Sequence, residues 1–525
     1  MASAWRMSVM AAAAFALAAA YDNGAPSSRT PPLGWSSWVS LAPDAHHPVF
    51  DYCDEAVVRH AMDAFMSVGL YEAGYRHFHL DDCWAGGRNS SGFLYPEEKH
   101  FPSGMKALVD YAHSKGLVFG LYTCAGDQVC VGGRPGSKGH WEKDAQVFAE
   151  WGVDWVKMDW CNTHGMRPAD TYPLMSRALN ATGRRIHLNM CEWGVDEPWT
   201  WGHETAQSWR MSGDHVGTWK STRELIRESA AIPAANTGRP YGWNDMDMLE
   251  TGNYEQAAHA NGQIGNMSRD EYMTEFSMWA ISASPLVVTT PIMNCTTSGG
   301  GQQRLGAHAR GIRGIVHPSM PGRLDAGGCS IVRAEQLSRQ PCVAGKSYGC
   351  FGSNASMWTD HGCRAYFVLD HGDRSVLCDE QGDGRHICSP SREPTAAVSC
   401  VGWLSELQRE ILLNAEVLAV NQDVTAQGRP VKESDLSVWA RWLSDGSVAV
   451  ALYNEDDAPR ELLIDFQTLG WARDQHVSVR DLWAHKDMGV THGRYPQQDF
   501  VMVRPHATVL LKLTKADAAM DITVI

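Results

Sequence analysis

From residue 31 onward, short apolar runs alternate with amphipathic segments of helical periodicity. Eight runs are expected to be strands: LGWSSW (Leu33–Trp38), HFHLDD (His77–Asp82), VFGLYTC (Val118–Cys124), VDWVKMD (Val153–Asp159), IHLNMCEW (Ile186–Trp193), SWRMSGD (Ser208–Asp214), YGWNDMDML (Tyr241–Leu249) and PLVVTTPI (Pro285–Ile292). Helices are expected within 54–69, 103–115, 141–151 and 269–282, with 403–420 as the eighth and Asp54 and Ser103 as N-caps. Eight strand–helix units predict an α/β fold, the (β/α)8 TIM barrel.

The run ending in Lys157, Asp159 and Cys161 carries the most informative polar residues. In a strand, Lys157 and Asp159 lie on the same face, at the end of the strand where TIM barrels do their chemistry. A buried ion pair without a catalytic role is the alternative for this stretch alone.

Other predicted strands also end in polar or aromatic side chains. They are Trp38, Asp81, Asp82, Tyr122, Glu192, Arg210, Asp214 and Asp247. Buried carboxylates at one barrel mouth repel each other unless they pair with Lys157 or Arg210 or bind hydroxyl groups. A polyol substrate would supply those hydroxyls.

The motifs TPPLGWSSW, LDDCW, VKMDWC, CEWG, WRMSGD, GWNDMDML and LLNAEVLAVNQD occur in this order. Together they resemble glycoside hydrolase family 27, the α-galactosidases. The resemblance implies a retaining exo-glycosidase that releases terminal α-D-galactosyl residues, with Asp159 as nucleophile and Asp214 as general acid/base. It assigns the sugar subsite to Trp38, Asp81, Asp82, Tyr122, Cys130, Lys157, Cys191, Glu192, Trp193, Arg210, Asp247 and Met248.

The segment Cys191–Gly194 resembles the galactosidase version of the family's specificity loop. There an acidic residue meets the 2-hydroxyl, and bulk excludes an acetamido group, so Glu192 and Trp193 favour galactose. An α-N-acetylgalactosaminidase, a β-L-arabinopyranosidase and a non-catalytic carbohydrate-binding protein stay as alternatives. Met246, where the family often has proline, and Cys124 depart from the pattern.

The same resemblance pairs Cys53 with Cys83 and Cys130 with Cys161, which leaves Cys124 and Cys191 unpaired. No metal or other cofactor is expected, because C-x-x-C and H-E-x-x-H are absent from the sequence and its histidines are scattered.

The first 20 residues resemble a signal peptide, with an apolar segment ending Ala18–Ala20. With 14 cysteines and five Asn-x-Ser/Thr sequons, the sequence predicts a secreted or vacuolar/lysosomal glycoprotein. The net charge of −15 disfavours nucleic acid as a partner, and no later run is long enough to span a membrane. An α-galactoside is the expected partner, and a homodimer is an open alternative to a monomer.

The catalytic barrel is expected over 21–294 and its last helix over 403–425. Between them, residues 295–402 contain eight cysteines and predict a disulfide-rich insertion between the eighth strand and the eighth helix. It is either an accessory sugar-binding or gating element or an inert surface insertion. Short alternating runs and an Asp445-Gly446 turn predict a C-terminal antiparallel β-sandwich over 426–525.

Overall fold

The computed structural model describes residues 22–41, 53–131, 133–253, 267–296, 302–304, 331–336, 348–351, 356–359, 365–369, 374–378, 386–388 and 399–516. The expected signal peptide and the sequons at Asn266 and Asn354 lie outside these residues. The described residues divide into two compact units. One contains residues 22–41 and the described residues of 53–294 and 401–516, and the other contains those of 295–400.

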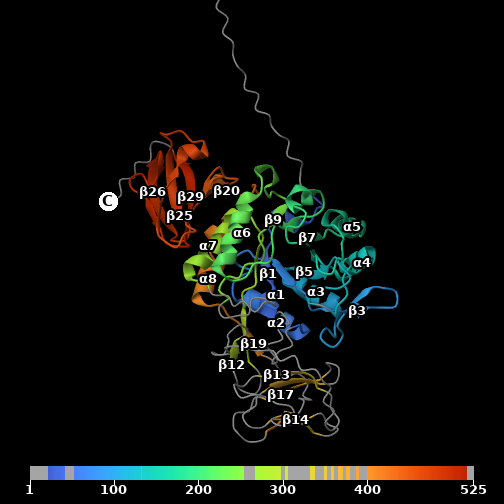
Figure 1. Ribbon diagram of the computed structural model, residues 1–525. Helices are drawn as coiled ribbons and strands as arrows, with labels where there is room; N and C mark the ends of the chain where they lie inside the picture. Colours follow the sequence, from blue (N-terminus) through green and yellow to red (C-terminus); the bar gives the residue numbers. More distant parts are fainter. Residues whose placement is uncertain are drawn as a thin grey trace, which may run out of the picture. The chain divides into compact units, whose positions relative to one another are not determined.

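A parallel sheet of eight strands forms the centre of the first unit (Figure 1). Its order is β10-β1-β2-β5-β6-β7-β8-β9, and a parallel bridge between Leu249 and Val288 joins the two ends. The predicted TIM barrel is therefore confirmed. The strands are β1 (Leu33–Ser36), β2 (His77–Leu80), β5 (Val118–Cys124), β6 (Trp155–Asp159), β7 (His187–Cys191), β8 (Ser208–Arg210), β9 (Trp243–Asp245) and β10 (Leu286–Val288).

Helices follow most of these strands, as the periodicity predicts. They are α1 (Ser37–Leu41), α2 (Glu55–Ser67), α3 (Gly104–Ser114), α4 (Trp141–Trp151), α5 (Pro168–Ala181), α6 (Trp219–Ala231), α7 (Arg269–Ile281), α8 (Glu406–Leu412) and α9 (Ala415–Asn421). The 3-10 turns η2 (Pro198–Thr200) and η3 (Gly202–Glu204) follow β7, and a hairpin of β3 (Ala85–Arg88) and β4 (Leu94–Pro96) follows β2.

The N-terminal caps of helices α2, α3 and α9 show how far the helix predictions hold. Asp54 caps α2, because its carboxylate accepts a hydrogen bond from the Ala56 amide at 2.8 Å. Ser103 occupies the N-cap position of α3, as predicted, but its backbone is helical and its side chain makes no cap bond. The single helix expected over 403–420 is divided, because Asn414 accepts bonds from Glu416 and Val417 and so begins α9.

The C-terminal part of the first unit is an antiparallel β domain, as predicted. Its main sheet has the order β20-β21-β22-β29-β25-β26, and Asp445-Gly446 turns the chain between β21 and β22. The strands are β20 (Arg429–Lys432), β21 (Asp435–Trp442), β22 (Val448–Tyr453), β25 (His476–Asp481), β26 (Lys486–His492) and β29 (Thr508–Ala516), with the pairs β23 (Arg460–Leu462) and β28 (Val501–Val503), and β24 (Ile464–Asp465) and β27 (Arg494–Tyr495).

Helix α7 connects this domain to the barrel, since it packs on α9 and on strands β22 and β29. Arg441 of β21 strengthens the connection. Its buried guanidinium donates to carbonyl groups near the C-terminal ends of α7 and α9, at 3.3 Å to Ala280 and 2.5 Å to Val420. A cation placed there also interacts favourably with the dipoles of both helices.

The second unit contains two antiparallel sheets of three strands, β13-β16-β17 and β14-β15-β18. Strands β12, β11 and β19 form a third sheet. These strands are β11 (Met293–Thr296), β12 (Gln302–Arg304), β13 (Ile331–Gln336), β14 (Tyr348–Phe351), β15 (Ser356–Thr359), β16 (Ala365–Leu369), β17 (Arg374–Cys378), β18 (His386–Cys388) and β19 (Ser399–Gly402). Within the described part of the chain, no helix has both the length and the apolar character that a bilayer crossing requires.

Candidate active site

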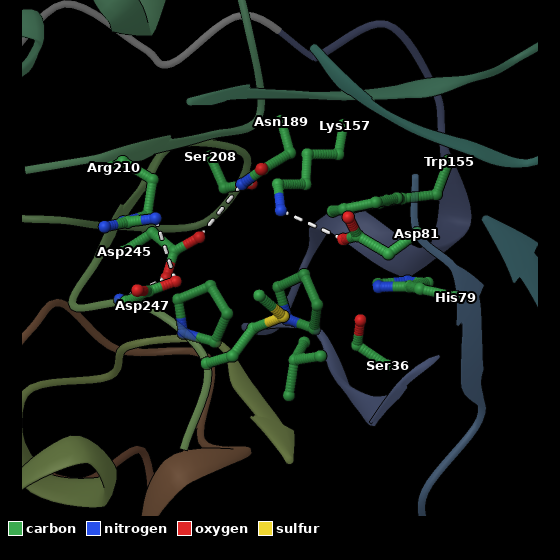
Figure 2. Close-up of a pocket in the computed structure, with 14 residues that line it drawn as sticks. Ser36, His79, Asp81, Trp155, Lys157, Asn189, Ser208, Arg210, Asp245 and Asp247 are labelled. Atoms are coloured by element: carbon green, nitrogen blue, oxygen red, sulfur yellow. Dashed lines mark hydrogen bonds and ion pairs between the residues drawn. The ribbon is translucent and has the colours of Figure 1, made fainter. Parts of the chain in front are cut away.

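Strand β6 places Lys157 and Asp159 at the carboxyl end of the sheet, where they are 8% and 7% exposed. The ammonium group of Lys157 forms an ion pair with Asp81, at 2.9 Å from its Oδ2 (Figure 2). Burial alone would lower the pKa of Lys157, but Asp81 and the neighbouring acidic groups raise it above its ordinary value. Lys157 is therefore a fixed positive charge among carboxylates.

Asp159 is held by two hydrogen bonds. Tyr122 Oη donates to Oδ2 at 3.0 Å, and the backbone amide of Trp160 donates to Oδ1 at 2.8 Å. Burial raises the pKa of Asp159, and Lys157 opposes that rise. Each oxygen thus has a set position before a ligand arrives.

Arg210, at the end of β8, organises the opposite side of the site. Its Nη1 lies 2.9 Å from Asp247 Oδ1, and its Nη2 lies 3.2 Å from Asp214 Oδ1. The side chain of Asp214 is 60% exposed, whereas those of Arg210 and Asp247 are 3% and 5% exposed. The prediction that 208–214 forms one regular strand is wrong, because β8 ends at Arg210 and Asp214 lies in the following loop.

The two residues after β2 have different environments. Asp81 pairs with Lys157, whereas Asp82 accepts a hydrogen bond from the Val131 amide at 3.3 Å. Burial raises the pKa of Asp82 to about 6, although Arg134, 3.8 Å away, opposes the shift. Asp82 therefore takes up a proton at a higher pH than an ordinary aspartate does.

Aromatic rings surround the Lys157 ammonium, which lies 5.6 Å from the centre of the Trp38 ring and 5.3 Å from that of Tyr122. Trp38 is partly exposed and Tyr122 is buried. These rings supply apolar and cation–π surface beside the carboxylates.

Glu192, directly after β7, is fully buried, and neither carboxyl oxygen has a hydrogen-bond partner in the structure. Burial raises its pKa to about 8, so the neutral acid is the favoured form at neutral pH. Both oxygens could bind a ligand's hydroxyl group.

The backbone of this loop turns sharply after Glu192. Trp193 is partly exposed with a φ of 58°, and Gly194 has a φ of 77°. A Cβ at Gly194 would lie 2.3 Å from the Met211 carbonyl oxygen, so only glycine fits at this close approach.

Both disulfides implied by the resemblance are present, Cys53–Cys83 and Cys130–Cys161. The second ties the loops after β5 and β6 together beside Asp159. Cys124 and Cys191 are free and buried, and Arg210 donates to the Cys191 sulfur at 3.6 Å. Among the described residues, the grouping of metal-ligand type is Cys130, Asp159 and Cys161, whose two sulfurs are bonded to each other.

A layer of polar residues that the sequence reasoning missed lines the pocket with Lys157 and Arg210 (Figure 2). The amide of Asn189 donates to Asp245 Oδ2 at 3.0 Å and to Ser208 Oγ at 2.8 Å. Asn189 of β7 is in register with Lys157 of the neighbouring strand β6. Its place beside an inward-facing residue was the sequence signal that could have identified it. The pocket also includes Met248, Ser36 and His79.

The chain matches the family described as "Alpha galactosidase A" over residues 30–300 and the "Alpha galactosidase C-terminal beta sandwich domain" over 433–513. It is 32% identical to the α-galactosidase of Cyamopsis tetragonoloba over 489 residues, which is 93% of this chain and 86% of that protein. It is 31% identical to α-galactosidase 2 of Arabidopsis thaliana over 492 residues, 93% of this chain and 90% of that one. The solved structure of α-galactosidase I from Mortierella vinacea aligns with a TM-score of 0.64 at 22% identity, covering 94% of this chain and 99% of that one.

Proposed function

This chain belongs to the α-galactosidase family of glycoside hydrolases and hydrolyses terminal α-D-galactosyl linkages, and we propose that Asp159 and Asp214 carry out this reaction with retention of configuration. Asp159 is the nucleophile and Asp214 is the general acid/base. The observation that supports this division is their contrast in setting: Asp159 is buried and held by two donors, whereas Asp214 is exposed to solvent.

In the first step, the Asp159 carboxylate bonds to the anomeric carbon while Asp214 gives its proton to the departing glycosidic oxygen. The aglycone leaves as an alcohol, and the galactosyl group stays as an ester of Asp159. In the second step, water attacks that carbon, Asp214 takes the water's proton, and the carboxylate of Asp159 is released. Formation of the ester removes a negative charge near Asp214, which favours its carboxylate form for the second step.

The polar groups around the pocket fit the hydroxyl groups of a hexose. Asp81 and Asp82 would bind the hydroxyls farthest from the anomeric carbon, and Glu192 would bind the 2-hydroxyl. Support for Glu192 comes from its two buried carboxyl oxygens, which a sugar hydroxyl would provide with hydrogen bonds. Trp193, beside it, would exclude a 2-acetamido group.

Hydrolysis of four p-nitrophenyl glycosides tests this proposal: the α-D-galactoside, the α-N-acetylgalactosaminide, the β-L-arabinopyranoside and the β-D-galactoside. We expect fast release from the α-D-galactoside, with α-galactose as the first product seen by NMR. Preference for the α-N-acetylgalactosaminide would overturn the roles of Glu192 and Trp193. Preference for the β-L-arabinopyranoside, which lacks the hydroxymethyl group, would overturn the roles of Asp81 and Asp82, and β-galactose as first product would overturn retention.

A further inference from the structure

Helix α7 carries two glutamates, four residues apart, that each contact a histidine from elsewhere in the chain. Glu271 Oε1 lies 2.7 Å from His506 Nδ1, beside the β domain. Glu275 Oε1 lies 2.9 Å from His215 Nε2, and both of these side chains are fully buried. Because His215 directly follows Asp214, the second pair reaches the loop of the candidate acid/base.

Hydrogen-bond donors surround the Glu275 carboxylate. Besides His215, the Glu250 amide donates to Oε1 at 2.9 Å, and Thr251 Oγ1 donates to Oε2 at 2.6 Å. A carboxylate accepts all of these bonds, which compensates for the cost of burying its charge. Glu275 therefore fixes the His215 ring to the segment that follows β9.

His215 itself has contacts on several sides. Its Nδ1 lies 2.9 Å from Ser221 Oγ of α6, and its ring lies 5.3 Å from that of Trp279. Its backbone amide donates to Asp247 Oδ2 at 2.7 Å, and Asp247 is the carboxylate that also pairs with Arg210. The residue next to Asp214 is thus held by α6, by α7 and by a group that lines the pocket.

We propose that Glu275 and His215 are positioning residues that hold Asp214 at the distance and angle needed for proton transfer. This inference rests on the proposed role of Asp214. A general acid must come within hydrogen-bond reach of the glycosidic oxygen. Asp214 lies in a loop with its side chain exposed, so its backbone needs a rigid support, and the buried pair provides one.

Substrates with different leaving groups distinguish a positioning role for Glu275 and His215 from a purely structural one. A phenyl α-galactoside requires protonation of its departing oxygen, whereas a 2,4-dinitrophenyl α-galactoside leaves without it. Misplacement of Asp214 therefore lowers kcat/KM for the phenyl substrate selectively. Loss of folded protein lowers kcat/KM for both substrates by one common factor.

The experiment measures kcat/KM for both galactosides with Glu275→Ala, Glu275→Gln and Ser221→Ala. Because displacements of about 1 Å can cost roughly 100-fold in rate, we expect about that loss for Glu275→Ala on the phenyl substrate and less than about threefold on the dinitrophenyl one. Glu275→Gln keeps an acceptor for His215 and should recover most of the loss. Ser221→Ala leaves the buried pair intact and should give a smaller loss with the same selectivity.

Glu271→Gln is the matched control, because it alters the other Glu–His contact on the same helix. It should lower the melting temperature without changing the ratio of the two kcat/KM values. Equal loss on both substrates for Glu275→Ala, or an unchanged ratio in Ser221→Ala, would overturn the inference. Asp214→Ala, measured in parallel, separates the acid/base role of Asp214 from the positioning role of Glu275 and His215. If Asp214→Ala lowers kcat/KM equally for both substrates, the proposed role of Asp214 fails. If Asp214→Ala is selective for the phenyl substrate but the Glu275 and Ser221 variants are not, only the positioning role fails.

Discussion

The two sides of the barrel mouth hold the two candidate catalytic carboxylates by different means. On the side of β5 and β6, Asp159 is part of a strand, and Tyr122 and the Trp160 amide bind its two oxygens. On the side of β8, Asp214 lies in a loop with a side chain that is 60% exposed, supported through Arg210 and the neighbouring His215. A group that attacks one carbon atom gains from a fixed position, whereas a group that exchanges protons with water needs solvent access. The difference suits the two roles proposed above.

The strongest test of this contrast replaces each carboxylate in turn. Asp159→Asn removes the nucleophile, so we expect turnover to fall by roughly 10⁴-fold or more on every galactoside. Asp214→Asn removes only proton transfer, and we expect a loss of about 10²- to 10⁴-fold that shrinks as the leaving group improves. Steady-state kinetics with circular dichroism as a folding control would measure both. On phenyl α-galactoside, whose leaving group requires protonation, retention of more than about a tenth of the rate in either variant would contradict its assignment.

Lys157→Met tests whether the charge of Lys157 keeps the buried nucleophile, Asp159, ionised. The positive charge of Lys157 lowers the pKa of Asp159, so its removal should raise that pKa further. Since Asp159 must be ionised to attack, the acidic limb of the kcat/KM profile should move to higher pH. The variant also leaves Asp81 without its buried partner, at a cost of about 3 to 5 kcal/mol in the free energy of unfolding. An acidic limb that stays in place would separate Lys157 from the control of Asp159.

Tyr122→Phe removes one donor from Asp159 and leaves the ring. The hydrogen bond to a charged group contributes about 1.5 to 3 kcal/mol, so kcat/KM should fall by roughly tenfold to a hundredfold. Because the change is confined to the nucleophile's side, phenyl and dinitrophenyl galactosides should be affected alike. A loss that depends on the leaving group would mean that the two sides are not independent.

Glu192 follows β7, which lies between β6 and β8 in the sheet. Its protonation should make the stability of the folded protein depend on pH. Burial raises its pKa from the usual 4.5 to about 8, with Arg210 opposing the rise. Between these values the folded protein keeps a proton that the unfolded chain has lost, so stability should fall as pH rises from about 4.5 to 8. One proton corresponds to at most about 1.4 kcal/mol per pH unit.

Glu192→Gln cannot ionise and should lack this contribution. Its melting temperature relative to the parent protein should therefore increase with pH across the same window. A difference between the two melting temperatures that stays constant from pH 5 to 8 would mean that Glu192 is ionised in the folded protein.

The sequence predicted the barrel because each strand is a short apolar run, and the residues at the strand ends followed from that assignment. Loop geometry was harder to predict. Asp214 was expected on a strand, but β8 ends at Arg210, and the contact between these residues comes from the loop's path. Asn189 does not stand at a strand end: it lies within β7, in register with Lys157, and so carries no strand-end signal in the sequence. The pairing of His215 with Glu275 joins residues 60 positions apart, which no local pattern indicates.

The burial of Arg441 at the junction with the barrel indicates whether the C-terminal β domain could be separated from the barrel. Burial lowers the pKa of its guanidinium to about 10, and the partners that compensate for that burial include carbonyl groups of the barrel helices α7 and α9. A fragment that ends before β21 would remove the guanidinium from those carbonyl groups. A separate β domain would expose the Arg441 side chain, which is 1% exposed in the whole protein. Truncation, fusion and domain-exchange designs should therefore keep the barrel and the C-terminal domain together as one unit of expression.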